Sequence, residues 1–483
     1  MQIAAAKEAE LLNQSKPVAW TPRNPFEEHM RWQMKLESFQ ATDFANVTRS
    51  TVLSSALSSK QQLIKLSPTT LKEMKVPKIH FGKYLICKVV DVPLPLIGIS
   101  TLVEDLNGDV EEMIIYNFSY NINDVSWLKE GSILIIKEPR LRYGLQGKAV
   151  SLRIDSPTDI IFTDSTDEEF LSKIGASKWH KPSTKDVELI RKNANDLFLK
   201  GKFDDALMLY NRAIRYSPDL PILYLNKASA YLRKNSFSKA YEAAKFGLEK
   251  GGDREKALLR MGMAAYGMKQ WKIAAKHFAE VLKDFAKNSS AEEQLKRATA
   301  RLNEQEKGKF NFKEMYVMSK ENAELDVSDY CGPIKITKIE GKGRGIVATN
   351  DIKKGTLLVV SKSFATSYSK DFTGNLISIN LIRNNEVGTA AEMLQTIRAM
   401  ENLHKNPQRA QEVYQLFSGN LDENDDENPD DYIDAARIQK ICAFNCFSTE
   451  ESIRGDHLKE DSHLFILPSY FNHSCIGKLR VVF

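Results

Sequence analysis

Five polar residues recur along the chain at spacings that suit the binding of an anion: Arg191, Asn195, Asn226, Lys256 and Arg260. Counted within a 34-residue repeat, they fall at positions two, five, six and nine, which lie on one stripe of a helix. Two amides and three cations on one stripe could hold the terminal carboxylate of a peptide and a nearby acidic side chain through charge-assisted hydrogen bonds. The alternative is that the amides are ordinary repeat positions and the cations are only solvated.

The elements that must position this stripe are the helices of an internal repeat. At an offset of 34 residues, small and aromatic residues superpose in three columns. The columns are Ala194, Ala228 and Gly262; Ala206, Ala240 and Ala274; and Tyr210, Ala244 and Phe278. Small residues let two helices approach closely and an aromatic residue fills the space beside them, so the pattern predicts paired helices. Three repeats and a helix from Ala291 onward would stack into a short α-solenoid over residues 183–305.

The spacing of these columns resembles that of tetratricopeptide repeats, and the stripe resembles the two-carboxylate clamp of the chaperone-binding members of that family. The resemblance implies that the stripe binds the acidic C-terminal tails, of the EEVD type, of cytosolic heat-shock chaperones. Arg191 stands where the family usually has lysine. Arginine keeps the positive charge, but its planar guanidinium prefers a different approach to a carboxylate.

A second candidate site begins at the glycine-rich turn 341–345, whose sequence is GKGRG. Glycines leave room for backbone amides to approach a ligand closely, although a glycine loop by itself is not specific. Here the turn lies between two strand-like runs, PIKITKIE and GIVAT, and a further turn, DIKKG, leads into TLLVV. The pattern predicts a strand–loop–strand unit.

The run Asn472-His473-Ser474-Cys475 stands near the other end of the chain. With the glycine turn before it, this run resembles the SET family of protein lysine methyltransferases, and ICAFNCF, which contains Asn445, is a weaker match to the SET-MYND branch. The matches cover residues 332–475, roughly a third of the chain. The alternative interpretation, if the resemblance is left aside, is that His473 is a core or surface histidine and that Cys475 fills buried apolar space.

The SET resemblance implies S-adenosylmethionine as the cofactor and assigns residues to its parts. The implied contacts are Lys342, Gly343 and Arg344 to the methionine part, Asn445 to the ribose or amino-acid part, and Asn472 with His473 to the adenine and ribose side.

In the implied reaction, a lysine amine of a protein substrate attacks the methyl group of the sulfonium. Because a solvated lysine has a pKa near 10.4, the site must admit it through a dry channel and align it. In SET enzymes a tyrosine beyond the NHSC motif orients that amine. Phe483 lies only eight residues beyond Cys475. We therefore expect the tyrosine segment to be missing and the SET domain at 330–483 to be incomplete. For this reason no catalytic residue is assigned.

No metal site is predicted. SET-MYND relatives carry a zinc finger between the two SET halves, whereas no cysteine occurs between Cys331 and Cys442. The corresponding insertion, residues 364–440, predicts helices in AAEMLQTIRAMENL and AQEVYQLF. Its acidic loop, residues 422–431, lacks the glycine and the closing glutamate of a calcium loop and predicts a solvated connection.

The N-terminal third is less specific. Residues 1–75 show short helical stretches without a sustained period, and we assign them no function. Residues 76–163 predict about five short strands, with a hairpin at Asn107-Gly108. Their spacing resembles an OB-like β-barrel, a fold with many uses. Because no basic and aromatic stacking platform is evident, we expect a structural or protein-docking barrel and no direct binding of nucleic acid.

Composition excludes other classes. With 42% hydrophobic and 27% charged residues and no run of 18 apolar residues, we expect a globular chain without a membrane span. The first residues lack the apolar stretch of a secretory signal. Five scattered cysteines favour a reducing compartment, so we expect an intracellular protein, cytoplasmic, nuclear or both. The net charge of +5 is mild for this length.

The sequence thus predicts an α+β multidomain protein: an N-terminal β domain, an α-solenoid of three tetratricopeptide repeats, and a mainly β SET region with a helical insertion. Two functions stay open. One is an S-adenosylmethionine-dependent protein lysine N-methyltransferase whose array helps to recruit the protein substrate. The other is a non-catalytic adaptor, in which the array binds chaperone tails and the SET region is inert.

Overall fold

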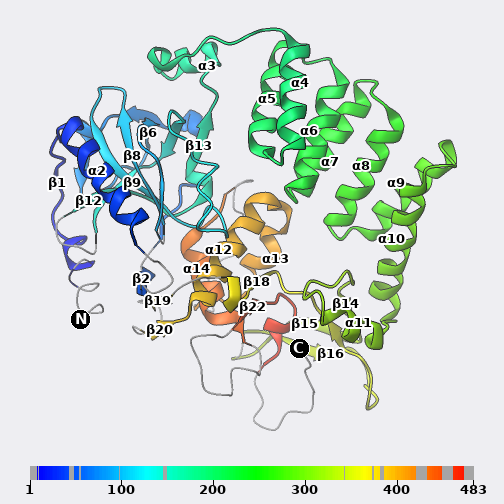
Figure 1. Cartoon of the computed structure of the whole chain (residues 1–483). Helices are drawn as coiled ribbons and strands as arrows, with labels where there is room; N and C mark the ends of the chain where they lie inside the picture. The colour runs from blue at the N-terminus through cyan, green and yellow to red at the C-terminus, as the bar shows by residue number, and fades with distance from the viewer. Residues whose placement is uncertain are drawn as a thin grey trace. The chain divides into compact units, whose positions relative to one another are not determined.

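The computed structural model describes residues 8, 10–42, 48–53, 56–96, 98–144, 149–341, 343–371, 375–380, 386–419, 432–448 and 461–472. For β2 (Thr48–Leu53), β19 (Asn375–Asn380) and β20 (Glu386–Gly388) it describes the backbone alone. The chain divides into two compact units (Figure 1). Unit 1 is formed by Met1–Ser183, Ala365–Pro407 and Val413–Leu464, and unit 2 by Thr184–Phe364, Gln408–Glu412 and Phe465–Phe483. The domain bounds expected from the sequence stay predictions.

Unit 1 contains a ten-stranded sheet. Its strands pair in the order β13-β10-β6-β8-β9-β12-β11-β5, with β3 beside β6 and β7 beside β8. They are β3 (Ser67–Thr69), β5 (Lys78–Ile79), β6 (Lys83–Val89), β7 (Leu94–Pro95), β8 (Ile99–Asp105), β9 (Val110–Ile115), β10 (Ile133–Lys137), β11 (Arg140–Tyr143), β12 (Val150–Ile154) and β13 (Ile160–Thr163). Most neighbours are antiparallel, but β12 runs parallel to β9 and β3 parallel to β6. The sheet confirms a β domain here, whereas its likeness to an OB barrel stays a prediction.

The hairpin predicted at Asn107-Gly108 joins β8 to β9. Gly108 has a φ of +87°, a left-handed conformation that glycine adopts without a steric penalty. The Asp105 carboxylate accepts hydrogen bonds from the N–H groups of Asn107 and Asp109, at 2.8 and 3.1 Å. Because β8 and β9 then pair antiparallel along their lengths, the predicted hairpin is confirmed.

Residues that precede the sheet in sequence complete its core. Trp20, Leu71 and Met74 are buried in one cluster with strand residues such as Leu85 and Met113. The elements of this segment are β1 (Val18–Ala19), which pairs with β4 (Lys75–Val76), and helix α2 (Pro25–Gln40). Part of the segment 1–75, to which the sequence assigned no function, therefore has a structural one.

The polar stretch after the sheet also packs against it. It holds helix α3 (Glu168–Lys173) and the 3₁₀ turn η5 (Ser177–Trp179). Leu171 and Trp179 are buried in a cluster with Tyr84 and Ile133. Together with Ile174 and Ala176 of the same cluster, these apolar side chains anchor a stretch that is otherwise polar.

Unit 1 also takes in residues 365–407 and 413–464. The strands β18 (Ala365–Ser367), β22 (Ser462–Leu464) and β21 (Cys446–Phe447) form one small sheet, and β2, β19 and β20 form another. The helices of this part of unit 1 are α12 (Ala390–Lys405) and α14 (Ala435–Asn445), and it holds the last residues of α13 (Ala410–Tyr414), whose first residues belong to unit 2. The helices predicted within residues 364–440 are confirmed, whereas their place inside a SET domain stays a prediction. Ile122 packs against Met393 and Ile397 of α12. The acidic loop at 422–431 lies outside the described residues.

Unit 2 begins with a helical array, drawn as successive helices in Figure 1. It comprises α4 (Val187–Leu199), α5 (Phe203–Tyr216), α6 (Pro221–Arg233), α7 (Phe237–Glu249), α8 (Arg254–Gly267), α9 (Trp271–Asp284) and α10 (Ser289–Lys307). All members of the three sequence columns are buried. A Cβ added at Gly262 would come within 2.5 Å of the Phe278 ring, so the close helix approach that the columns predict is real. The predicted helix pairs and the helix from Ala291 are confirmed.

The rest of unit 2 is a short helix and two strand pairs. They are α11 (Phe312–Ser319), then β14 (Tyr330–Cys331) paired with β17 (Val359–Val360), and β15 (Ile334–Ile339) paired with β16 (Gly343–Ala348). The antiparallel register of β15 and β16 places Ile339 opposite Gly343. The strand–loop–strand unit predicted around the glycine turn is therefore confirmed.

Candidate functional site

The five stripe residues lie on the first helices of the three repeats, and we call this surface the clamp face. Arg191 and Asn195 lie on α4, Asn226 on α6, and Lys256 and Arg260 on α8. Asn226 Nδ2 donates a hydrogen bond to Asn195 Oδ1 at 3.0 Å, which joins α4 to α6. The structure therefore brings the two amides together, as the spacing required. That they bind a ligand stays a prediction.

Tyr210, on α5, belongs to the clamp face although the sequence indicated only a packing role for it. Its hydroxyl donates to Asn195 Oδ1 at 2.7 Å. Burial raises the pKa of Tyr210 to about 12, and the positive charges of Arg191 and Arg260 oppose that rise. Both guanidinium groups thus lie close enough to act on the phenol. The sequence could have indicated this role, because Tyr210 is the one member of its column that has a hydroxyl group.

Arg260 differs from the other two cations of the clamp face. Burial lowers the pKa of its guanidinium, which nevertheless stays charged at physiological pH. Its Nη1 is fully buried, and among the described residues it has no hydrogen-bond partner. A buried donor without an acceptor is costly, and a carboxylate oxygen is the acceptor that suits a guanidinium best. Of the three cations on the clamp face, Arg260 is therefore the one that an anionic ligand would stabilise most.

Arg191 and Lys256 are each paired with an acid three residues earlier. The Arg191 guanidinium donates to Glu188 at 2.9 and 2.5 Å, and Lys256 Nζ lies 2.9 Å from Asp253 Oδ2. A hydrogen bond from Lys256 lowers the pKa of Asp253, which also caps α8 by accepting from the Lys256 N–H. Glu188 and Lys256 are largely exposed, so these pairs are weak and a ligand can displace them.

A second cluster, formed by one tyrosine of α8 and two arginines of α10, surrounds a carboxylate, and the sequence did not predict it. Tyr266 of α8 donates to both carboxylate oxygens of Asp326, at 2.8 and 2.9 Å. Arg297 and Arg301 of α10 donate to Asp326 Oδ2 at 2.9 and 3.2 Å. Burial alone would raise the pKa of Asp326, but the hydrogen bonds from Tyr266 and Arg297 outweigh it and lower the pKa. This carboxylate is therefore held in its ionised form.

The residues 325–329 around Asp326 form what we call the strap. Ser328 is buried, donates its N–H to Glu304 Oε2 at 2.8 Å, and accepts from Trp271 Nε1 at 2.9 Å. Asp329, at the end of the strap, pairs with Lys269. It also accepts a hydrogen bond from the backbone N–H of Lys362, which lies just after β17. The strap therefore fastens the array to the strands β14 and β17.

The glycine turn and Asn472 meet in unit 2. A Cβ added at Gly345, which is buried in β16, would lie 2.5 Å from Asn472 Nδ2 and 2.6 Å from Ile339 Cδ1. Gly343 has a φ of +71°, and Arg344 is exposed. The first residue of the Asn472–Cys475 motif therefore lies beside the glycine turn, and the rest of the SET resemblance stays a prediction. Lys342 and residues 473–475, with His473 among them, lie outside the described residues.

Asn445 belongs to unit 1, at the end of α14. It is buried, and its Nδ2 donates to the carbonyl oxygens of Phe417 and Ile441, both at 2.7 Å. Both amide hydrogens thus serve the local fold, and Oδ1 is the polar atom left for a ligand. Its cofactor role stays a prediction.

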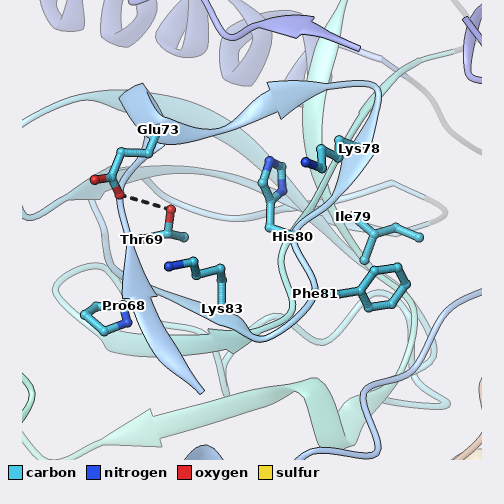
Figure 2. Close-up of a pocket in the computed structure, with 8 residues that line it drawn as sticks. All are labelled: Pro68, Thr69, Glu73, Lys78, Ile79, His80, Phe81 and Lys83. Atoms are coloured by element: carbon cyan, nitrogen blue, oxygen red, sulfur yellow. Dashed lines mark hydrogen bonds between the residues drawn. The ribbon is translucent and has the colours of Figure 1, made fainter. Parts of the chain in front are cut away.

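A hollow of about 510 Å³ in unit 1 has no predicted site residue in its wall (Figure 2). His80 lies in it with both nitrogens bonded: Nδ1 donates to Pro139 O and Nε2 accepts from the Lys75 N–H, each at 2.9 Å. Burial lowers the pKa of this imidazole, which keeps it neutral. Glu73 accepts from the Thr69 hydroxyl at 3.2 Å. Because His80 and Glu73 are engaged in the fold, we assign no reaction to the hollow.

Within the described part of the chain, no group of three or more His, Cys, Asp or Glu side chains could hold a metal ion. Four cysteines fall in that part and are free thiols: Cys87, Cys331, Cys442 and Cys446. No helix of the described ranges is long and apolar enough to cross a membrane.

Comparison with known proteins supports the helical repeats and finds similarity to a protein named methyltransferase. Residues 194–235 match a family model described as TPR repeat, which confirms the tetratricopeptide prediction for that part of the array. Over 455 residues, 86% of this chain, the sequence is 24% identical to a protein from Gibberella zeae named methyltransferase. The chain spans 61% of the length of that relative.

Two further similarities concern the array. RNA polymerase II-associated protein 3 from Homo sapiens is 27% identical over 154 residues, 31% of this chain and 23% of that protein. The solved structure of the first TPR domain of Spaghetti (RPAP3), bound to the HSP90 peptide SRMEEVD, is 26% identical and covers 25% of this chain and 95% of that one, with a TM-score of 0.24. A TM-score this low supports no inference.

Proposed function

We propose that this protein is an S-adenosylmethionine-dependent protein lysine N-methyltransferase with a peptide-binding helical array. The contact between Gly345 and Asn472 carries the proposal for methyl transfer, because it unites the two motifs that resemble the SET family. The 24% identity to a protein named methyltransferase, over 86% of the chain, agrees with it.

The residues around the glycine turn fit a bound nucleotide-like cofactor. Gly341 and Gly343 adopt left-handed backbone conformations, and the missing side chain at Gly345 lets the Asn472 amide pack directly against β16. Lys342, Gly343 and Arg344 would hold the methionine part, and Asn472 with His473 the adenine and ribose side. When bound, S-adenosylmethionine supplies the methyl group that a deprotonated lysine amine accepts.

Calorimetric titration of the purified chain with S-adenosylmethionine tests this proposal. We expect saturable binding by the wild type and binding about tenfold weaker by Asn472→Ala, because the variant loses hydrogen bonds to the ligand. The matched control is Asn350→Ala, an exposed asparagine just beyond β16 that should bind like the wild type. Absence of heat in the wild type at about 1 mM ligand, which corresponds to a binding free energy weaker than about −4 kcal/mol, would rule the proposal out. A protein substrate is then sought by transfer of a labelled methyl group.

We also propose that the clamp face binds peptides that end in a carboxylate and carry a nearby acidic side chain, such as the acidic tails of cytosolic chaperones. Two observations support this: the hydrogen bond between Asn195 and Asn226, and the Nη1 of Arg260, for which the described part of the chain supplies no hydrogen-bond partner. If the cofactor does not bind, this second function alone describes the adaptor alternative.

Fluorescence polarisation with a labelled EEVD-ending peptide tests the clamp. Arg260→Ala removes the buried cation, and we expect its affinity to fall about 30-fold, which corresponds to about 2 kcal/mol. Lys276→Ala, an exposed cation on α9, is the control and should bind like the wild type. Equal affinities of wild type and Arg260→Ala would contradict the assignment.

A further inference from the structure

The Asn195 side chain is held in one orientation by two neighbours. Its Oδ1 accepts from the Tyr210 hydroxyl at 2.7 Å and from Asn226 Nδ2 at 3.0 Å. A carbonyl oxygen has two lone pairs, so this acceptor is fully used inside the array. Asn195 can therefore offer a ligand only the N–H donors of its Nδ2.

Tyr210 can act as the donor in this arrangement at any physiological pH. Its pKa, raised to about 12 by burial, keeps the phenol protonated. Its ring is 1% exposed and packs with Ala194 and Ala206, so the hydroxyl is delivered from a fixed position. The other members of its column, Ala244 and Phe278, have no hydroxyl.

The tyrosine hydroxyl occurs in the one repeat of the three that has an asparagine at position nine. Position nine of the repeat is Asn195 in the first unit, but Ser229 and Met263 in the second and third. Ser229 satisfies its own hydroxyl on the carbonyl of Leu225. An aromatic hydroxyl thus occurs in the same unit as the amide that it orients.

We propose that Tyr210 is a positioning residue that makes the clamp face selective for a terminal carboxylate over a carboxamide. This rests on the proposed peptide binding. A carboxylate only accepts hydrogen bonds, so it matches the donors of Asn195, whereas the NH₂ group of a carboxamide would face them. Without the phenol hydroxyl, the Asn195 amide is free to turn through 180° and to present its oxygen to such an NH₂ group.

The test compares two peptides that differ in one group: an EEVD-ending peptide with a free C-terminal carboxylate and the same peptide with a C-terminal amide. The quantity measured is the ratio of their two dissociation constants. In Tyr210→Phe we expect the preference for the carboxylate to fall about three- to tenfold, the effect of one hydrogen bond. The control is Tyr224→Phe, whose hydroxyl donates to Pro218 O at 2.9 Å, and there the ratio should not change.

The outcomes separate this inference from the function on which it rests. If the wild type binds neither peptide, the peptide-binding function fails. If the wild type binds with a preference that Tyr210→Phe retains in full, the positioning role is wrong and the function stands. Thermal unfolding of both Tyr variants checks the fold. If Tyr210→Phe does not fold, Asn195→Asp takes its place: it keeps both internal hydrogen bonds but faces the ligand with an acceptor, so the preference for the carboxylate should disappear, and its persistence would overturn the inference.

Discussion

The array carries two clusters that combine a tyrosine with two arginines, and they differ in what they hold. In the first, Tyr266 with Arg297 and Arg301 binds the carboxylate of Asp326 from the same chain. In the second, on the clamp face, Tyr210 donates to the amide of Asn195 and the charges of Arg191 and Arg260 act on its phenol, while Arg260 Nη1 has no partner among the described residues. Similar groups thus serve the fold in the first cluster and are left open in the second.

The filled cluster is an internal example of what the open one can do. Asp326 receives a phenol donor and two guanidinium donors, and together they lower its pKa against the effect of burial. A ligand carboxylate on the clamp face would meet a guanidinium and amide donors in a comparable setting. We infer from this difference that the strap contributes to stability, whereas the clamp face is less stable than it could be because its ligand-binding donors are left without acceptors.

Removing the internal carboxylate should have the largest effect. Asp326→Ala leaves Arg297 and Arg301 without their shared partner, and we expect the free energy of unfolding to fall by about 1–3 kcal/mol; the lower part of this range reflects the partial exposure of Asp326. Urea denaturation followed by tryptophan fluorescence measures it. Asp351→Ala, in an exposed turn, should change the value by less than about 0.5 kcal/mol. Equal stabilities of the two variants would mean that the contacts of Asp326 do not stabilise the fold.

The arginines of the two clusters should respond differently. Arg301 is bonded to both Glu304 and Asp326, so Arg301→Ala should cost about 2 kcal/mol of stability. Arg260→Ala removes a partly desolvated cation, so stability should change by less than about 0.5 kcal/mol or rise slightly. Urea denaturation of the two variants measures this contrast. A large loss in Arg260→Ala would show that the clamp face is structural too, and the comparison would break down.

Acid should weaken the strap in a defined pH range. The pKa of Asp326 is lower in the folded protein than in the unfolded chain, so as the pH falls the unfolded chain binds a proton first. The contribution of this carboxylate is therefore complete above about pH 4 and is lost as the pH falls through its lowered folded-state pKa. Stability measured between about pH 5 and pH 2 should fall less steeply in Asp326→Asn than in the wild type. Identical slopes would contradict the charged state assigned to Asp326.

Sequence predicted the parts of this fold that depend on local periodicity. The column Ala194, Ala228 and Gly262 identifies the helix pairs, because close packing demands small residues at a fixed interval. The turn at Gly108 likewise follows from two adjacent residues. Pairing of the two clamp amides could be predicted because Asn195 and Asn226 are almost one repeat apart.

The strap could not be predicted in the same way. Asp326 lies 29 residues from Arg297 in a stretch without a period, so nothing in its neighbourhood indicates its partners. Leu71 and Met74 were missed for a related reason, since single apolar residues between polar ones become core residues only when a distant sheet covers them. The role of Tyr210 was hidden by its packing: the column accounts for its ring but not for its hydroxyl.

The smallest effect expected concerns the acid that neutralises Arg191. Glu188 holds the guanidinium of Arg191 on an exposed helix turn, and a ligand carboxylate must compete with it. Glu188→Gln weakens that competitor, so the affinity for an EEVD-ending peptide should rise about twofold, with a larger gain at low salt than at high salt. Fluorescence polarisation at two salt concentrations measures both, with Glu292→Gln, whose acid pairs with Lys296 on α10, as the control. A lower affinity in Glu188→Gln would mean that Glu188 orients Arg191 for the ligand rather than competing with it, and the clamp face would then resemble the filled cluster more closely than the comparison allows.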